Sequence, residues 1–249
     1  MNTAESCFRA ATLADKCGTA VFYFVFAISS VLLAFEGPKV ESFGHPALIV
    51  AAALAITCTV VTTIYQTEGN RALRATQLSD ALGAGMGEDI RQDYYNNLLP
   101  QSIRRLAATT LENTLFTKEI LSKMAVKQRF KGGFYFILLV ALLVYRETPT
   151  NWLLMLAQTL FSADLLLKWI RLERFRVRAN RVHQHLSQFF LQNGDPTRPN
   201  DMAVLLGAFT DYECAKDEAV MPLEDKIFKR LNPELSRKWQ ELQERLRIR

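Results

Sequence analysis

Long stretches without charged residues constrain this chain more than any other feature. Nineteen uncharged residues lie between Lys16 and Glu36, and twenty-six lie between Glu41 and Glu68. At a rise of about 1.5 Å per residue, a helix over either stretch is long enough to cross a hydrocarbon core of roughly 30 Å. The connection between them is short and rich in glycine and proline, which favours a turn. We therefore expect a transmembrane helical hairpin over residues 18–66.

Two shorter apolar stretches follow later in the chain. Fourteen uncharged residues separate Lys131 from Arg146, and sixteen separate Glu147 from Asp164. Both are shorter than the roughly 20 residues of a typical span, but flanking lysines can extend to the membrane surface and tryptophans suit both interfaces. We expect a second, thinner transmembrane hairpin over residues 131–168, whose mismatch is relieved by bilayer thinning or by packing against other subunits.

The distribution of lysine and arginine predicts the orientation. The turn inside each hairpin carries one positive residue, whereas the segment Gln66–Lys131 carries ten and the tail from Lys168 carries sixteen. Positive residues remain on the cytoplasmic side of a membrane. The expected cytoplasmic parts are the N-terminus (residues 1–17), an insert between the hairpins (67–130) and the tail (169–249). Both termini are therefore expected in the cytoplasm, with almost no external domain.

The cytoplasmic insert has helical patterns. The helix of the second span is expected to continue to Leu82 and to break at the glycine-rich run of residues 83–87. Because no strand precedes this run, a hinge is favoured over a dinucleotide-binding loop. Apolar residues then recur at helical spacing over Pro100–Arg129, with Pro100 or Ser102 expected near the helix start.

The tail is also expected to be helical. One helix is predicted over Lys168–Leu191, and Asp201 is predicted to cap a final helical pair, with breaks at Met221-Pro222 and at Asn232-Pro233. No segment of the chain has the pattern of a strand. The fold class expected is all-α: an integral membrane protein of two transmembrane hairpins with a helical cytoplasmic insert and a helical C-terminal tail.

The sequence has no recognisable catalytic or cofactor-binding motif. His183 and His185 lie about 200° apart around a helix, so they cannot share a metal ion, and both are expected on the surface. Adjacent carboxylate pairs occur without an apolar pocket to tune their pKa values. The cysteines are scattered, with no zinc or redox spacing, and are expected to be reduced in the cytoplasm. We therefore expect neither an enzyme nor a cofactor.

Polar residues inside the spans have two possible roles. Serine and threonine hydroxyls can bond to their own helix backbone or join helices, or they can line a water-filled seam between subunits. Asp164 is costly in lipid, and Lys168 lies one turn away as a partner. The candidate pore-lining residues are Gln158, Ser162, Thr59, Thr63 and Asp164. The polar face of the short second hairpin predicts a homo-oligomer, with a tetramer preferred.

Four arginines after the fourth span share one helical face. They recur at helical spacing, and they are Arg171, Arg174, Arg178 and Arg181. This face can lie on anionic lipid beside the membrane. In a ring of identical chains it forms instead a basic collar that could hold a polyanion, such as a nucleotide or a short oligonucleotide.

This arrangement resembles the four-transmembrane-helix pore-forming effectors encoded beside nucleotide-second-messenger synthases in bacterial anti-phage defence islands (the SMODS-associated type). The resemblance includes the two hairpins, the helical insert, the helical tail and a tail pattern of Tyr212-x-x-Ala215, Met221-Pro222, Ile227-Phe228 and Trp239. It implies a multi-pass protein of the bacterial inner membrane that depolarises an infected cell. The signal from a partner nucleotidyltransferase would open the pore or hold it closed.

Two other functions remain open from the sequence. A membrane scaffold could recruit partners through its cytoplasmic helices. A small transporter should show internal repeats and broken spans at matched positions, and the two hairpins are only loosely similar.

Overall fold

The computed structural model is all-helical over the residues that it describes, which are 3–35, 38–85, 99–145, 149–160 and 163–248. The helices in these ranges are α1 (Thr3–Ala34), α2 (Pro38–Leu82), α3 (Ile103–Val144), α4 (Thr150–Leu160), α5 (Lys168–Leu191), α6 (Pro199–Ala219) and α7 (Asp225–Arg245). A π-helical turn, Ala163–Leu167, leads directly into α5. The all-α class is confirmed for this part of the chain.

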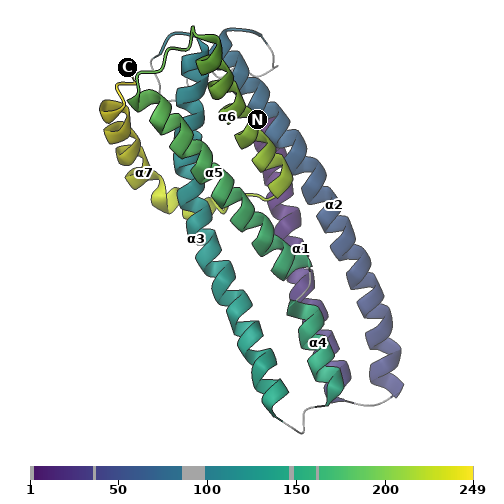
Figure 1. Ribbon diagram of the computed structural model, residues 1–249. Coiled ribbons are helices and arrows are strands. Elements are labelled where there is room, and N and C mark those ends of the chain that lie inside the picture. The colour runs from purple at the N-terminus through teal and green to yellow at the C-terminus, as the bar shows by residue number, and fades with distance from the viewer. Residues whose placement is uncertain (1–2, 36–37, 86–98, 146–148, 161–162, 249) are drawn as a thin grey trace.

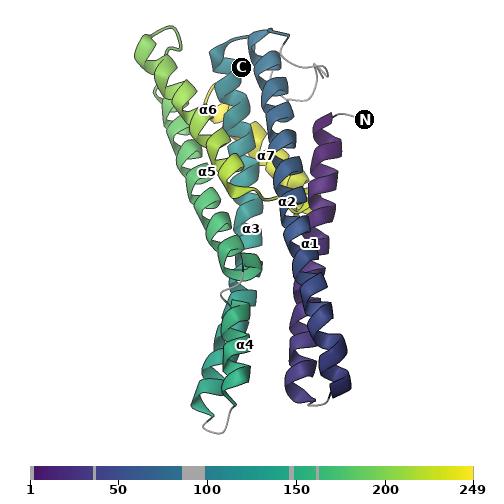
Figure 2. The same cartoon turned by 90° about the vertical axis from the view of Figure 1, so that its right-hand side faces the viewer.

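The helices form two hairpins at one end and a broader bundle at the other (Figures 1 and 2). In Figure 2, α1 and α2 form one arm, and α4 and the lower part of α3 form the other. α2 has 45 residues and α3 has 42, and each helix continues without a break from an arm into the bundle. The expected boundaries at residues 66/67 and 130/131 therefore fall inside continuous helices.

The ends of these long helices follow local signals in the sequence. α2 continues to Leu82 as predicted, and Gly83 ends it with a φ of 70°, a left-handed conformation that glycine adopts without steric cost. At the start of α3, Ser102 is the N-cap, and its hydroxyl accepts a hydrogen bond from the Arg105 N–H at 3.2 Å. Both expectations are confirmed.

The arms expose apolar side chains. α1 and the Ser42–Leu82 part of α2 are long and apolar enough to cross a membrane. The lower part of α3 also exposes a set of large apolar side chains, namely Phe130, Phe134, Phe136, Ile137, Val140, Leu143 and Val144. α4 has only 11 residues, or about 16 Å of helix, so spanning by the second hairpin stays a prediction.

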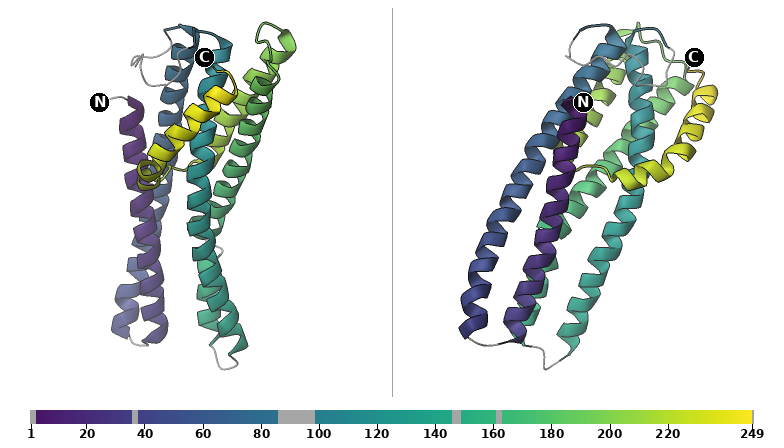
Figure 3. Two further views of the ribbon diagram at one scale, coloured as in Figure 1. Left: turned by 90° about the vertical axis from the view of Figure 1, so that its left-hand side faces the viewer. Right: turned by 180° about the vertical axis from the view of Figure 1, so that it is seen from behind.

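The bundle has one main hydrophobic core between α3, α5, α6 and α7. The apolar faces predicted on the insert and tail are buried in it, including Leu111 and Ile120 on α3, Leu186 on α5 and Trp239 on α7. α7 lies obliquely across α3 (Figure 3). These residues meet because each helix has a single apolar stripe that must be removed from water.

Two predicted features of the tail are wrong. Pro233 lies inside α7 and does not end it, because the apolar face continues on both sides of the proline, from Ile227 to Trp239, and is buried. Asp201 is not the N-cap of α6, because that helix begins at Pro199 with Arg198 as its N-cap. Proline is favoured in the first turn, and the Asp201 carboxylate instead accepts a hydrogen bond from the Asp195 N–H at 2.9 Å.

Candidate functional site

The arginine face of α5 is partly neutralised within the chain. Arg174 and Arg178 pair with Glu218 of α6 at 3.2 Å and 2.7 Å, and Arg178 also lies 3.8 Å from Asp211. Arg171 and Arg181 are exposed, and neither has an ion-pair partner among the described residues. Only half of the predicted collar therefore carries uncompensated charge.

The two threonines of the predicted pore lining bond to their own helix. Thr59 Oγ1 donates to the Ala55 carbonyl at 2.9 Å, and Thr63 Oγ1 donates to the Thr59 carbonyl at 2.8 Å. This is the backbone-bonded alternative that the sequence left open. Each hydroxyl has one proton, so neither threonine can donate a further hydrogen bond while it is bonded to its own helix.

Ser162 lies outside the described residues, and so do the side chains of Gln158 and Asp164. Lys168, expected beside Asp164, has a partner that the sequence did not indicate, because its Nζ lies 2.7 Å from Asp15 Oδ1 on α1. This ion pair joins the first hairpin to the start of α5.

The prediction that His183 lies on the surface is wrong. Only 8% of His183 is exposed, its Nδ1 lies 3.4 Å from Thr114 Oγ1, and burial lowers its pKa to about 4, with the charge of Lys118 acting in the same direction. His183 is therefore neutral near pH 7. His185 is exposed, as predicted. Spacing alone could not tell which of the two faces α3.

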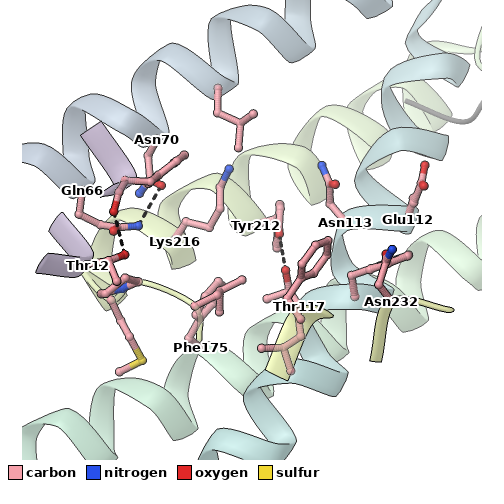
Figure 4. Close-up of a pocket in the computed structure, with 18 of the residues that line it drawn as sticks. Thr12, Gln66, Asn70, Glu112, Asn113, Thr117, Phe175, Tyr212, Lys216 and Asn232 are labelled. Carbon is pink, nitrogen blue, oxygen red and sulfur yellow. Dashed lines mark hydrogen bonds between the residues drawn. The ribbon is translucent and has the colours of Figure 1, made fainter. Parts of the chain in front are cut away.

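A cavity of about 520 Å³ lies where the first hairpin meets the bundle (Figure 4). We call it the junction cavity. Its walls come from α1, α2, α3, α5, α6, α7 and the linker between α6 and α7. Its aromatic lining residues are Phe8, Phe116, Phe175, Tyr212 and Phe228. The size lies within the 300–1,000 Å³ typical of small-molecule sites.

A partly buried charge network joins α2 to α6, and its members Asn70 and Lys216 line the junction cavity. The Glu213 carboxylate forms ion pairs with two cations. Its Oε1 lies 2.6 Å from Lys216 Nζ, and its Oε2 lies 2.9 Å from Arg74 Nε. Arg74 also pairs with Asp217, whose other oxygen accepts from Asn70 Nδ2 at 3.0 Å. Burial lowers the pKa of Lys216, and the Glu213 carboxylate opposes that shift. Two cations and two carboxylates leave the network neutral overall.

Two buried acceptors in the wall of the junction cavity have no hydrogen-bond partner among the described residues. They are Gln66 Oε1 and Glu112 Oε2, on side chains only 6% and 8% exposed. Among the side chains labelled in Figure 4, Gln66 lies at one end and Glu112 at the other, with Lys216 and Tyr212 between them. Burial raises the pKa of Glu112 to about 7. Buried acceptors are normally paired, so these two oxygens are unusual in the wall of a cavity.

The Tyr212 hydroxyl lies 2.8 Å from Thr117 Oγ1, which fixes its ring in the wall between the two acceptors.

The charge pattern of the sequence did not predict the junction cavity. The one available signal was Glu112 itself, a carboxylate on the apolar stripe beside Leu111 and Leu115.

A second cavity, of about 580 Å³, lies between the first hairpin and the π-helical turn before α5. We call it the seam cavity. It is lined by α1 from Ala14 to Ser29, by α2 from Leu48 to Thr63, and by Leu167, Lys168, Arg171 and residues 219–221. Thr59 and Thr63 belong to this lining.

The linker between α6 and α7 lies between the two cavities. Met221 is buried and lines both, and Val220 beside it lines the seam cavity. Val220 has φ 42° and ψ 52°, a left-handed conformation that is unfavourable for a β-branched residue. The linker therefore forms part of the wall of both cavities.

No family model, curated protein or solved structure matches this chain. Its function must therefore be argued from the site and from the physical pattern of the helices.

Proposed function

We propose that the chain is a membrane effector that assembles into a homo-oligomeric pore, a tetramer in the preferred form, and responds to a ligand in the junction cavity. The observation that carries this proposal is the position of that cavity, at the level where α2 and α3 pass unbroken from the apolar arms into the charged bundle. A ligand there contacts the helices that would carry a movement into the membrane.

Four spans with both termini in the cytoplasm are part of this proposal. Besides the two long apolar helices, the exposed apolar face at the lower end of α3 supports a second membrane hairpin. Lys131 Nζ lies 4.8 Å from the Tyr23 ring centroid, which suits a cation at the membrane surface between the two hairpins. The bacterial inner membrane is the location proposed.

The ligand proposed is a nucleotide or a short oligonucleotide made by a partner nucleotidyltransferase. Aromatic rings in the junction cavity can stack with a base, and the polar side chains of Gln66 and Glu112 belong to the same wall. Lys216 supplies a cation in the same wall, and Arg171 and Arg181 are uncompensated cations on α5. Arg174 and Arg178 contribute less than the sequence suggested, because Glu218 already pairs with them.

The scaffold alternative has less support. An amphipathic helix that recruits a partner must present its apolar face, whereas Leu235, Trp239 and Leu242 of α7 are buried inside the chain. A transporter likewise gains no supporting observation from the described residues.

The test uses the full-length protein in proteoliposomes loaded with a fluorescent dye. Mononucleotides, cyclic dinucleotides and short oligonucleotides are added, and dye release is measured. Gln66→Leu removes a polar side chain from the cavity wall and is expected to abolish the response to the active nucleotide. Gln184→Leu is the matched control, because Gln184 is exposed on α5 and lines neither cavity.

Equal responses in the two variants would remove the junction cavity from the mechanism. The conduction path is tested separately with leucine at both Gln158 and Ser162, which is expected to reduce dye release while membrane insertion is preserved. If the wild type releases no dye with any nucleotide and does not depolarise cells that express it, the pore proposal fails.

A further inference from the structure

We propose that the seam cavity is a specific phospholipid site, in which one acyl chain lies between the first hairpin and the π-helical turn and an anionic headgroup binds Arg171. This proposal rests on the membrane embedding included in the proposed function, and it does not require that the protein conducts ions.

The seam cavity is elongated along the first hairpin. It follows α1 over 15 residue steps, from Ala14 to Ser29, which corresponds to a length of about 22 Å. Its volume of about 580 Å³ is spread over that length. A long space of this kind beside apolar side chains matches the shape of a single hydrocarbon chain.

Much of the wall of the seam cavity is suited to hydrocarbon. Most of the lining is apolar, including Val21, Val25, Leu48, Ala52 and Ala55. The lining threonines Thr59 and Thr63 already donate to carbonyls of their own helix. Ser29 and Thr62 also line the cavity, and the charged residues Asp15, Lys168 and Arg171 lie together at one end of it. The apolar part of the wall therefore suits a hydrocarbon chain, and the charged end suits a polar headgroup.

The cytoplasmic mouth of the seam cavity carries the charge that an anionic headgroup needs. Lys168 is neutralised by Asp15 at 2.7 Å, whereas Arg171 lines the cavity, is exposed and has no ion-pair partner among the described residues. A guanidinium binds phosphate through two parallel hydrogen bonds. The next arginine on this face, Arg174, is paired with Glu218. The phosphate is therefore placed at Arg171, one helical turn beyond the Asp15–Lys168 pair.

The experiment measures phospholipid bound to the full-length protein by native mass spectrometry. The protein is extracted from vesicles that contain equal amounts of phosphatidylglycerol and phosphatidylethanolamine, in a detergent that strips loosely bound lipid. The wild type is expected to retain one phospholipid per protomer, with phosphatidylglycerol favoured about tenfold or more, because a charge-assisted contact contributes enough for one decade of affinity.

Two pairs of variants test the binding of the acyl chain and the binding of the headgroup separately. Ala55→Phe fills the slot and is expected to lose the bound lipid, whereas Ala53→Phe, at an exposed position outside the cavity, is expected to keep it. Arg171→Gln is expected to keep a lipid but to lose the preference for phosphatidylglycerol. Arg181→Gln, which replaces the other unpaired arginine of this face away from the cavity, is expected to keep that preference.

Several outcomes would overturn the proposal. Equal retention in all four variants would mean that the lipid is only annular, and a lipid-free wild type that remains folded would mean that the slot is empty. Size-exclusion profiles and thermal unfolding of each variant show whether the protein is folded. Extraction of the wild type from membranes by alkaline carbonate would instead refute the membrane embedding, so the two failures are distinguishable.

Discussion

Replacing Glu112 with glutamine tests the burial of an unpaired carboxylate in the junction cavity. Burial raises the pKa of Glu112 from its ordinary value of 4.5 to about 7, and no residue that the structure describes bonds to its Oε2. The folded chain therefore holds a proton on Glu112 at a pH where the unfolded chain has released it. Glutamine has nearly the same shape and cannot ionise. The substitution therefore removes the part of the pH dependence of stability that comes from the Glu112 carboxyl group.

The sign and size of the effect follow from that shift in pKa. Below about pH 4.5 the carboxyl group is protonated in both states and contributes no pH dependence. As the pH rises from about 4.5 to about 7, the unfolded state binds fewer protons than the folded state, so wild-type stability falls. A shift of about 2.5 units corresponds to at most about 3 kcal/mol, which is fully lost above pH 7. For a chain of this size that is about 6–12 °C in Tm.

The assay is thermal unfolding of the full-length protein in detergent, followed by tryptophan fluorescence, in which buried Trp239 reports on the bundle core. The difference in Tm between Glu112→Gln and the wild type is expected to favour the variant increasingly from pH 5 to pH 8. Glu119→Gln, two turns further along α3 and only half-buried, is the control. A Glu112→Gln difference that stays constant over this pH range would refute the argument that Glu112 is a buried, unpaired acid.

Three further predictions use other parts of the chain. His183 has a pKa lowered from 6.5 to about 4, so wild-type stability is expected to fall as the pH drops through that window, and thermal unfolding of His183→Gln should show a weaker fall. Glu213→Gln leaves Lys216 without its carboxylate and is expected to cost about 3 kcal/mol in denaturant unfolding, whereas an unchanged midpoint would show that the network contributes nothing. A cysteine that replaces Ser42 is expected to react with an impermeant reagent from outside the cell, and one that replaces Arg181 is expected to react only after lysis. The reverse pattern would show that the protein has the opposite orientation.

The all-helical fold and the apolar arms could be predicted from the sequence because they depend on short-range patterns. Charge-free stretches and helical periodicity are properties of neighbouring residues, and they located the apolar part of α1, the long α2 and the span of α5, although α1 begins at Thr3, well before the predicted span. Local stop and start signals were also sufficient, since Gly83 ends α2 and Ser102 caps α3 as expected. Where a local signal failed, as at Pro233, burial of the apolar face on both sides outweighed the missing backbone donor.

The candidate site could not be predicted in the same way, because it depends on which helix faces meet. Glu218 neutralises Arg174 and Arg178 from α6, and Asp15 reaches Lys168 from α1, across 153 residues of sequence. Periodicity gives each helix a face, but the rotation and offset of two packed helices depend on side-chain fit over the whole interface. The sequence by itself therefore determined the helices and their apolar surfaces. Only the tertiary structure decided that Glu112 and His183 are buried and that two cavities share Met221, because burial is a property of the assembled helices.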